Sequence, residues 1–231
     1  MNIVPAVDRL AVKWEDHILD LSPVELRNGR WYKREDLFAP LGPGSINGSK
    51  LRQLIWLISG AVAQSARGIV TGASVHSPQL SMSALVGRHF GLPVHIVLGG
   101  TKRSSAFKHP NVAIARLAGA QFSFIPVGFN PAIQSAVRGL AASPEFDGWY
   151  QLHYGITTPP DAGDAFIADF HRVGAEQARN IPPSVRTLVM TLGSGNSAVS
   201  ILYGLHLYPP PALEHVVLLI IGPNRLQWMY A

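Results

Sequence analysis

The chain has 231 residues, of which 47% are hydrophobic and 14% are charged, and it has no cysteine and a formal net charge of +5. That length allows one large or two small domains, and the lack of cysteine excludes a disulfide framework, a thiolate metal site and a cysteine nucleophile. The basic balance permits a phosphate-bearing cofactor or DNA as a partner, but there is no dense basic run and no nucleic-acid module, so scattered surface charge is the simpler explanation. We expect no metal site. We also expect a cytoplasmic protein with no membrane partner, because neither residues 1–14 nor any later segment has the apolar length of an export signal or a membrane span.

The first strong feature is a turn that delivers a lysine to the start of a helix. Residues 1–30 show little periodicity, and residues 31–38 predict a short strand that leads into a run rich in Gly, Pro, Ser and Asn. Lys50 follows, and apolar residues then recur at helical spacing as far as Ile58. The positive end of a helix dipole disfavours a cation in the first turn. Lys50 is therefore either an ordinary solvated lysine or an amine held for chemistry that needs a lowered pKa, such as Schiff-base formation.

From residue 68 the pattern alternates between apolar strands and amphipathic helices. Strands are predicted at 68–72, 92–100 and 120–126, and helices at 79–90, 111–119 and 130–142. Because helical crossovers connect these strands, the strands should be parallel. Together with the low charged fraction, this predicts an α/β fold, doubly wound, with mostly parallel sheets and helices on both faces.

The second half of the chain begins with a long segment without regular periodicity. Residues 143–163 predict an ordered loop that carries Tyr150, His153 and Tyr154. After it, a helix is predicted at 165–180, a buried strand at 184–191, a helix at 198–207 and an apolar strand at 215–221.

The turn Gly193-Ser194-Gly195-Asn196-Ser197, between a strand and a helix, has the features of an anion site. Its glycines permit a close approach, its hydroxyls can donate, and the free N–H groups of the following helix point to the same place. It lacks the lysine of a Walker loop and the third glycine of the dinucleotide fingerprint. A purely steric reason for the glycines remains the alternative.

The turn at residues 73–79 is the second candidate. Ser77 suits the N-cap and Pro78 the first helical position, which is a sufficient structural account of both. The functional alternative is a ligand at this helix N-terminus, in contact with Ser77, Gln79 and His76. In open parallel sheets ligands lie at the carboxyl ends of the strands, where both turns and the lysine turn could meet.

In order and spacing these motifs resemble those of the fold-type II pyridoxal-phosphate (PLP) enzymes, and most of all the branch with 1-aminocyclopropane-1-carboxylate deaminase and D-cysteine desulfhydrase. The similarity lies in residues 32–37, 47–54, the Ser77 turn and 193–197, and it runs from about residue 22 to 225. It implies that Lys50 forms the Schiff base with PLP, and that Ser77, Pro78 and Gln79 lie along the cofactor ring. The residues implied for the phosphate are Gly193, Ser194, Gly195, Asn196 and Ser197.

The same resemblance implies two lobes and a homodimer. The larger lobe would comprise residues 1–55 and 140–231, and the smaller inserted lobe residues 56–139. Family members continue beyond the last predicted strand with elements that supply the residue facing the pyridine nitrogen, a contact that tunes the cofactor. We therefore expect a minimal member, a subunit completed by a partner, or a degenerate cofactor binder.

Two positions depart from the family pattern. Pro78 stands where the family has the asparagine beside the cofactor's ring oxygen, so that hydrogen bond is lost unless Gln79 or His76 replaces it. Asn47 and Ser49 stand where the family has glycine and asparagine.

Three functions remain open. The first is a PLP-dependent lyase or deaminase that acts on a small amino-acid-like substrate by deamination or elimination, with Lys50 as acid or base and with Ser77, His76 and Tyr154 as candidates on the substrate side. The second is a PLP-dependent enzyme that modifies an amine-bearing base in DNA, which would show salt-dependent DNA binding. The third is a non-catalytic protein that binds PLP or another anion without turnover.

Overall fold

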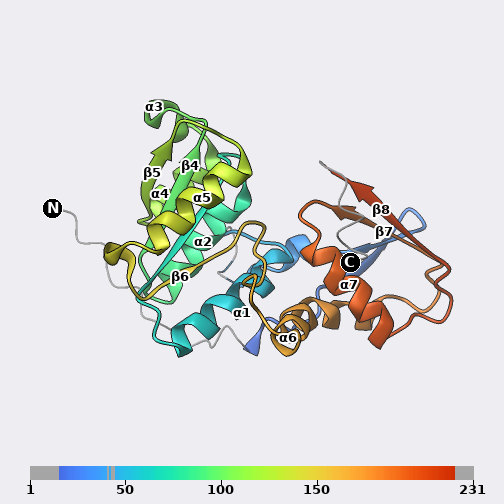
Figure 1. Cartoon of the computed structure of the whole chain (residues 1–231). Helices are drawn as coiled ribbons and strands as arrows, with labels where there is room; N and C mark the ends of the chain where they lie inside the picture. Colours follow the sequence, from blue (N-terminus) through green and yellow to red (C-terminus); the bar gives the residue numbers. More distant parts are fainter. Residues whose placement is uncertain (1–15, 41, 43–44, 222–231) are drawn as a thin grey trace.

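The computed structural model describes residues 16–40, 42 and 45–221, which form two α/β bodies side by side with helix α1 (Lys50–Ala63) between them (Figure 1). The first body contains a four-stranded sheet in the order β5-β4-β3-β6, and the second contains the two-stranded sheet β7–β8. Every neighbouring pair in these two sheets is parallel. The strands are β3 (Gly68–Ala73), β4 (Val94–Gly99), β5 (Gln121–Ile125), β6 (Trp149–Gln151), β7 (Thr187–Leu192) and β8 (His215–Ile220).

The predicted alternation of strand and helix is confirmed, as is the doubly wound α/β class. The longer helices are α2 (Pro78–His89), α4 (Pro110–Leu117), α5 (Asn130–Ala141), α6 (Asp164–Ala175) and α7 (Asn196–Leu207). The sequence did not predict α3 (Arg103–Ala106), a four-residue helix between β4 and α4. Two 3-10 turns, η3 (Pro144–Phe146) and η4 (Glu176–Asn180), precede β6 and follow α6.

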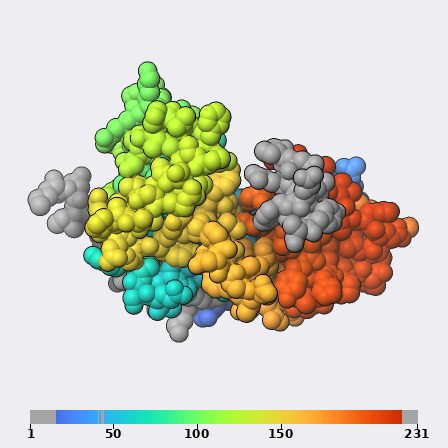
Figure 2. All heavy atoms as spheres, viewed as in Figure 1, coloured from blue at the N-terminus to red at the C-terminus, as the bar shows by residue number. Residues whose placement is uncertain are grey.

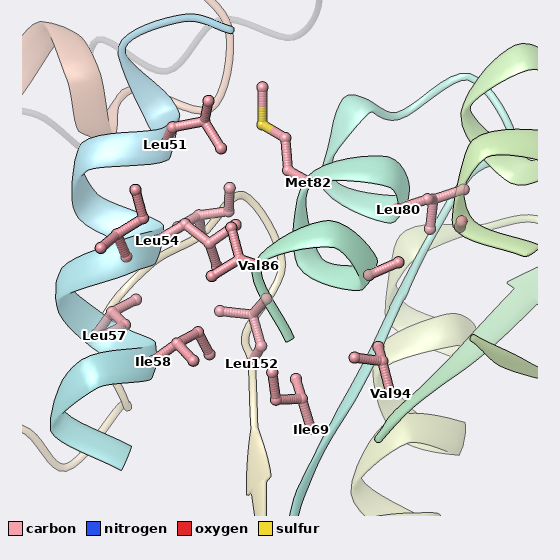
Figure 3. Close-up of a cluster of buried hydrophobic side chains, with 14 of the residues drawn as sticks. Leu51, Leu54, Leu57, Ile58, Ile69, Leu80, Met82, Val86, Val94 and Leu152 are labelled. Carbon is pink, nitrogen blue, oxygen red and sulfur yellow. The ribbon is translucent and has the colours of Figure 1, made fainter. Parts of the chain in front are cut away.

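Helices cover both faces of the four-stranded sheet. On one face α1 presents Leu51, Leu54 and Ile58 at helical spacing, and these fully buried side chains pack with Val86 of α2 and Ile69 of β3 (Figure 3). The other face is covered by α5. There a Cβ at Gly72 would lie only 2.7 Å from Val137 Cγ2, so that glycine lets the helix lie close to the sheet.

Three sequence-based expectations need correction. The predicted strand at 31–38 is a strand only as far as Lys33, because residues 35–37 form a 3-10 turn, η2 (Glu35–Leu37). The short strand is β2 (Arg30–Lys33), which pairs antiparallel with β1 (Val24–Arg27) through a turn in which Asn28 and Gly29 both have positive φ.

The predicted loop at 143–163 contains η3 and β6, and β6 pairs with the central strand β3. Strand β6 has three residues, which are too few to show a periodic apolar pattern in the sequence. This strand lies beyond residue 139, where the smaller lobe was predicted to end, and the division into lobes stays a prediction.

The strand predicted as buried at 184–191 is β7, and alternate residues along it are exposed. Its partner β8 is exposed along most of its length, with Leu219 51% exposed. The described part of the chain places no second layer over this face. Among the described residues, no helix is both long enough and apolar enough to cross a membrane.

Candidate active site

Lys50 is the first residue of α1, as predicted, and it meets the glycine loop. Its Nζ donates to Ser194 Oγ at 3.3 Å, although 144 residues separate the two in sequence. Burial lowers the pKa of Lys50 below the ordinary lysine value. The site therefore holds an amine that is neutral, and so nucleophilic, over a wider pH range than a surface lysine.

The glycine loop forms the start of α7. Gly195 has a φ of 99°, a conformation that favours glycine, and α7 begins at Asn196. No side chain in the described part of the chain caps this helix, so the N–H groups of its first turn stay free for an anion. Ser194 and Ser197 are half-buried beside them. These are the donors that a phosphate group requires.

Asn196 has a different role from its neighbours. Its side chain is buried, and Nδ2 donates to the carbonyl oxygens of Gly155 and Ile156, both at 3.2 Å. The amide thus holds the segment after β6 against the glycine loop. Asn196 Nδ2 is therefore engaged within the protein, and a cofactor-binding role for Asn196 stays a prediction.

Gly155 joins the two turns that the sequence singled out. Its N–H donates to Gln79 Oε1 at 2.8 Å, and its carbonyl oxygen accepts from Ser194 Oγ at 3.5 Å. With a φ of 80°, and with a Cβ that would lie 2.9 Å from Ser194 Cβ, this position requires glycine. Sequence reasoning missed Gly155, although the loop that contains it was marked as a candidate functional segment.

Gln79 and Ser77 organise the turn before α2. Gln79 Nε2 donates to Thr71 Oγ1 at 2.9 Å and to the His153 carbonyl oxygen at 3.1 Å, so every polar atom of this buried amide already has a protein partner. Ser77 Oγ accepts from the Gln79 N–H at 3.3 Å and is the N-cap of α2. The cofactor-binding roles of both residues stay predictions, and the Gln79 side chain would reach a ligand only by giving up a hydrogen bond.

The remaining candidates lie around this turn. Tyr154 is half-buried against the main hydrophobic core and directly precedes Gly155. His76 is exposed, and its ring lies 4.8 Å from that of His109 in an edge-on arrangement. Burial lowers the pKa of His153. Catalytic roles for these side chains stay predictions.

Behind the site, three polar side chains link α1 to α7 and α6. Gln53, one turn after Lys50, donates from Nε2 to Ser200 Oγ at 2.9 Å. Ser200 Oγ donates in turn to the Asn196 carbonyl oxygen at 3.0 Å, and His171 Nδ1 lies 3.0 Å from the same hydroxyl. This linkage, which sequence reasoning missed, fixes the two helix N-termini relative to each other. The sequence signal that could have revealed this linkage was Gln53, a polar amide within the apolar face of the predicted helix.

A cavity of about 380 Å³ adjoins this linkage. Ser49 and Ser197, the neighbours of the lysine and of the glycine loop, both line it, as does Gln53. Lys50 and Ser194 do not line it. The cavity therefore lies beside the Lys50–Ser194 contact rather than containing it.

The charged segment before α1 forms a buried network. Arg52 is 1% exposed and donates to the Ile18 carbonyl oxygen at 2.7 Å, to Ser22 Oγ at 2.8 Å and to Glu35 Oε2 at 3.4 Å. Lys33 Nζ donates to the Ser22 carbonyl oxygen at 3.0 Å. The network attaches the β1–β2 hairpin to the helix that carries Lys50.

The chain can be compared with known proteins. No protein-family model matches the sequence. It is 39% identical over 239 aligned positions, which cover 98% of this chain and 56% of the relative, to the O-seryl-dTMP PLP-dependent decarboxylase of Salmonella phage ViI. It is 28% identical over 155 positions, covering 64% of this chain and 44% of the relative, to a 1-aminocyclopropane-1-carboxylate deaminase of Burkholderia multivorans. The chain thus spans about half the length of these relatives.

Among solved structures, an ACC deaminase homologue superposes with a TM-score of 0.62 at 21% identity, over 81% of this chain and 55% of the other. The fold is therefore that of the fold-type II enzymes. With the sequence relatives, it shows that the chain is a partial-length homologue of the fold-type II PLP-dependent enzymes.

Proposed function

We propose that the chain binds PLP through Lys50 and acts on the α-carbon of an amino acid that is attached to a thymidine nucleotide, by decarboxylation. The observation that supports the cofactor assignment is the contact of the half-buried Lys50 amine with the glycine loop, 3.3 Å from Lys50 Nζ to Ser194 Oγ. An amine whose pKa is lowered by burial is neutral over a wider pH range than a surface lysine, which suits an aldehyde, and an uncapped helix N-terminus suits a phosphate. The residues present fit PLP in both respects.

When bound, PLP supplies an electron sink for bond cleavage at the α-carbon. The chain's own residues hold and orient the reactants. The N–H groups at the start of α7, with the hydroxyls of Ser194 and Ser197, would hold the phosphate, while Gly155 and Gln79 keep the two turns in register. Because burial lowers the pKa of Lys50, its Nζ can take up and release a proton near neutral pH more readily than an ordinary lysine. Lys50 would thus deliver to the α-carbon the proton that replaces the carboxylate.

The substrate class is supported by the phage relative, whose name specifies decarboxylation of a seryl-modified thymidylate. That relative aligns over nearly the whole chain, whereas the deaminase relatives align over 64% of it. This favours an amino acid linked to a nucleotide over a free amino acid, which agrees with the alternative of an amine-bearing base in DNA. Deamination or elimination on a small amino acid is the second candidate, favoured by the resemblance to the deaminases.

The cofactor assignment is tested on purified protein incubated with PLP. We expect an absorbance band that borohydride abolishes, and a reduced pyridoxyl group that mass spectrometry locates on the peptide containing Lys50. Lys50→Ala should abolish the band, and Lys102→Ala, which removes an exposed lysine, should leave it intact. A reducible band that persists in Lys50→Ala would refute the assignment.

The reaction is tested by incubating the PLP-loaded protein with O-seryl-dTMP, alone and within a DNA strand, and measuring both carbon dioxide and ammonia. Carbon dioxide alone supports decarboxylation, and ammonia supports the deaminase alternative. PLP binding without either product, on these substrates and on small amino acids, supports the non-catalytic alternative.

A further inference from the structure

The charges of this chain are segregated along the sequence. Residues 37–144 contain nine of the 19 Lys and Arg residues and none of the 14 Asp and Glu residues. This acid-free segment, residues 37–144, therefore carries a formal charge of +9, and the rest of the chain, with ten cations and 14 anions, carries −4. Such an asymmetry favours a positive field wherever several of these cations lie together on the surface. The net charge of the whole chain is only +5 because the charges of the two parts offset each other.

Most of this charge lies on the surface. Lys50 and Arg52 point inward, and the other seven cations of the acid-free segment are exposed. Four of them surround the short helix α3 and form what we call the α3 cluster: Lys102, Arg103, Lys108 and Arg116. Arg116 belongs to it because its guanidinium lies over the ring of Phe107, the C-cap of α3, at 4.5 Å. Within the described part of the chain, none of the four forms an ion pair with a carboxylate.

The α3 cluster lies on the same edge of the sheet as the candidate site. It follows the carboxyl end of β4, and α3 stands at the outer tip of the first body (Figures 1 and 2). His109, next to Lys108, has its ring 4.8 Å from that of His76, and Asn111 Nδ2 donates to the His76 carbonyl oxygen at 3.0 Å. His76 directly precedes Ser77, the N-cap of α2. The cluster is thus continuous with the turn that borders the site.

An exposed aromatic ring accompanies the charges. Phe129 is 74% exposed and begins α5 at the carboxyl end of β5. The loop before α5, which contains Gly128, lies against the loop between β4 and α3, which contains Gly100. A Cβ at Gly100 would be 2.8 Å from Gly128 Cα. Cations beside an exposed aromatic ring suit a nucleic acid, because the cations can contact phosphates and the ring can stack on a base that has left the helix.

We propose that the α3 cluster is a docking surface for duplex DNA, with Lys102, Arg103 and Lys108 on backbone phosphates and Phe129 beside them. The inference rests on the proposed function and deepens it, because it means that the modified nucleotide is presented within DNA rather than as a free nucleotide. A lysine held in the half-buried position of Lys50 cannot reach a base stacked within a duplex, so the target nucleotide leaves the helix while the flanking duplex stays on the cluster.

The test measures binding of a fluorescein-labelled 20-base-pair duplex to the PLP-loaded protein by anisotropy between 50 and 200 mM salt. We expect Lys102→Gln/Arg103→Gln/Lys108→Gln to weaken binding by about tenfold or more at 100 mM salt, and to reduce the slope of log K against log salt by about 2 to 3, since each lost phosphate contact removes about 0.9. The control Arg30→Gln/Arg172→Gln/Arg186→Gln removes the same charge from exposed positions outside the acid-free segment and should leave the slope within about 1 of wild type.

Phe129→Ala should weaken binding at every salt concentration without changing the slope, because no charge is lost. An equal loss of duplex affinity in both triple variants would overturn the proposal in favour of general basicity. If poly-glutamate competes as well as unlabelled duplex, the proposal is overturned in favour of an acidic protein partner. Tighter binding of a single strand than of the duplex would also overturn it. The borohydride-reducible band is measured on the same samples. If the protein keeps the band but binds no duplex, the docking surface alone is refuted. If the protein lacks the band, the proposed function is refuted.

Discussion

Two partly buried lysines in this chain show how the surroundings of an amine decide what it can do. Lys33 is held by protein acceptors, with Nζ donating to Asn180 Oδ1 at 2.7 Å and to the Ser22 carbonyl oxygen at 3.0 Å, and with Glu35 Oε1 at 3.8 Å. Among the described residues, the hydrogen-bond partner of Lys50 Nζ is the Ser194 hydroxyl, at 3.3 Å. One hydroxyl leaves most of the donor capacity of the Lys50 amine unused within the described part of the chain. Lys33 is therefore suited to attach the hairpin, and Lys50 is suited to react.

Lys33 gives a prediction on the pH dependence of stability. Burial lowers the pKa of Lys33 to about 8, whereas in the unfolded chain it has the ordinary value of 10.5. Between these two values the unfolded chain binds a proton that the folded chain has lost, so this group makes the free energy of unfolding rise as pH rises. The desolvation of the charged amine is a cost that is fully present below about pH 8 and disappears by about pH 10.5.

Urea denaturation at pH 7.5 and pH 10 measures this effect in wild type and Lys33→Met. The free energy of unfolding of wild type minus that of the variant should increase by about 1 to 3 kcal/mol between the two pH values. Lys102→Met, at an exposed lysine, should show a constant difference. If the Lys33→Met difference is constant as well, the folded-state pKa of Lys33 is ordinary.

At the scale of elements, the site depends on two helices that begin at the same place. α1 contributes Lys50 in its first turn and α7 contributes the free N–H groups, and the Gln53–Ser200 hydrogen bond of 2.9 Å joins them one turn further along. Because Ser200 also donates to the Asn196 carbonyl oxygen, the linkage reaches the turn that would hold the phosphate. A small displacement of either helix would separate the lysine from the glycine loop.

Ser200→Ala should therefore affect both stability and cofactor affinity. The change leaves the buried Gln53 amide without its acceptor, which should lower the free energy of unfolding by about 1 to 3 kcal/mol. Adding Gln53→Met, which replaces that amide by an apolar side chain of similar length, should cost less in the double variant than the sum of the single changes. PLP affinity, from absorbance titration, should fall in each of these variants.

Ser123→Ala is the matched control for this experiment. Ser123 Oγ lies 2.8 Å from His95 Nε2, between β4 and β5, in a comparable partly buried contact away from both helix N-termini. It should lower stability and leave PLP affinity unchanged. Equal losses of affinity in Ser123→Ala and Ser200→Ala would mean that general destabilisation, rather than helix placement, controls binding.

At the scale of the whole molecule, the site contains parts of three distant regions: α1, the segment after β6 and the start of α7. They meet at Ser194, through Lys50 Nζ at 3.3 Å and the Gly155 carbonyl oxygen at 3.5 Å. A ligand that contacts all three should stabilise the entire fold, because it binds only when they are assembled.

Saturating PLP should thus raise the thermal midpoint of the whole chain. At 100 times the dissociation constant the stabilisation is about 2.7 kcal/mol, equivalent to roughly 5 to 10 °C for a chain of this size. Calorimetry or differential fluorimetry would measure it, with Lys50→Ala as the control that should lose most of the shift. An equal shift in Lys50→Ala would mean that PLP binds without the lysine.

Much of the fold was predictable because its determinants are local. The apolar spacing on α1, the Ser77 cap with Pro78, and the glycines before α7 each specify a conformation through neighbours in sequence, and the structure has each element where the pattern placed it. The failures had two different causes. The three-residue strand β6 is too short for periodicity, and exposure of β7 depends on which elements pack against it.

The site itself needed the folded chain. Residue types and turns identified Lys50 and the loop 193–197 as candidates, since their chemistry can be recognised from the side chains and their immediate neighbours. That they touch, that Gly155 joins them to Gln79, and that Gln53 supports them from behind follow from packing between residues 76 to 147 positions apart. Contacts over such separations depend on how the helices and sheets pack, and no local pattern encodes them. The acid-free segment was readable from the sequence, but its concentration around α3 beside the site required the topology of the sheet.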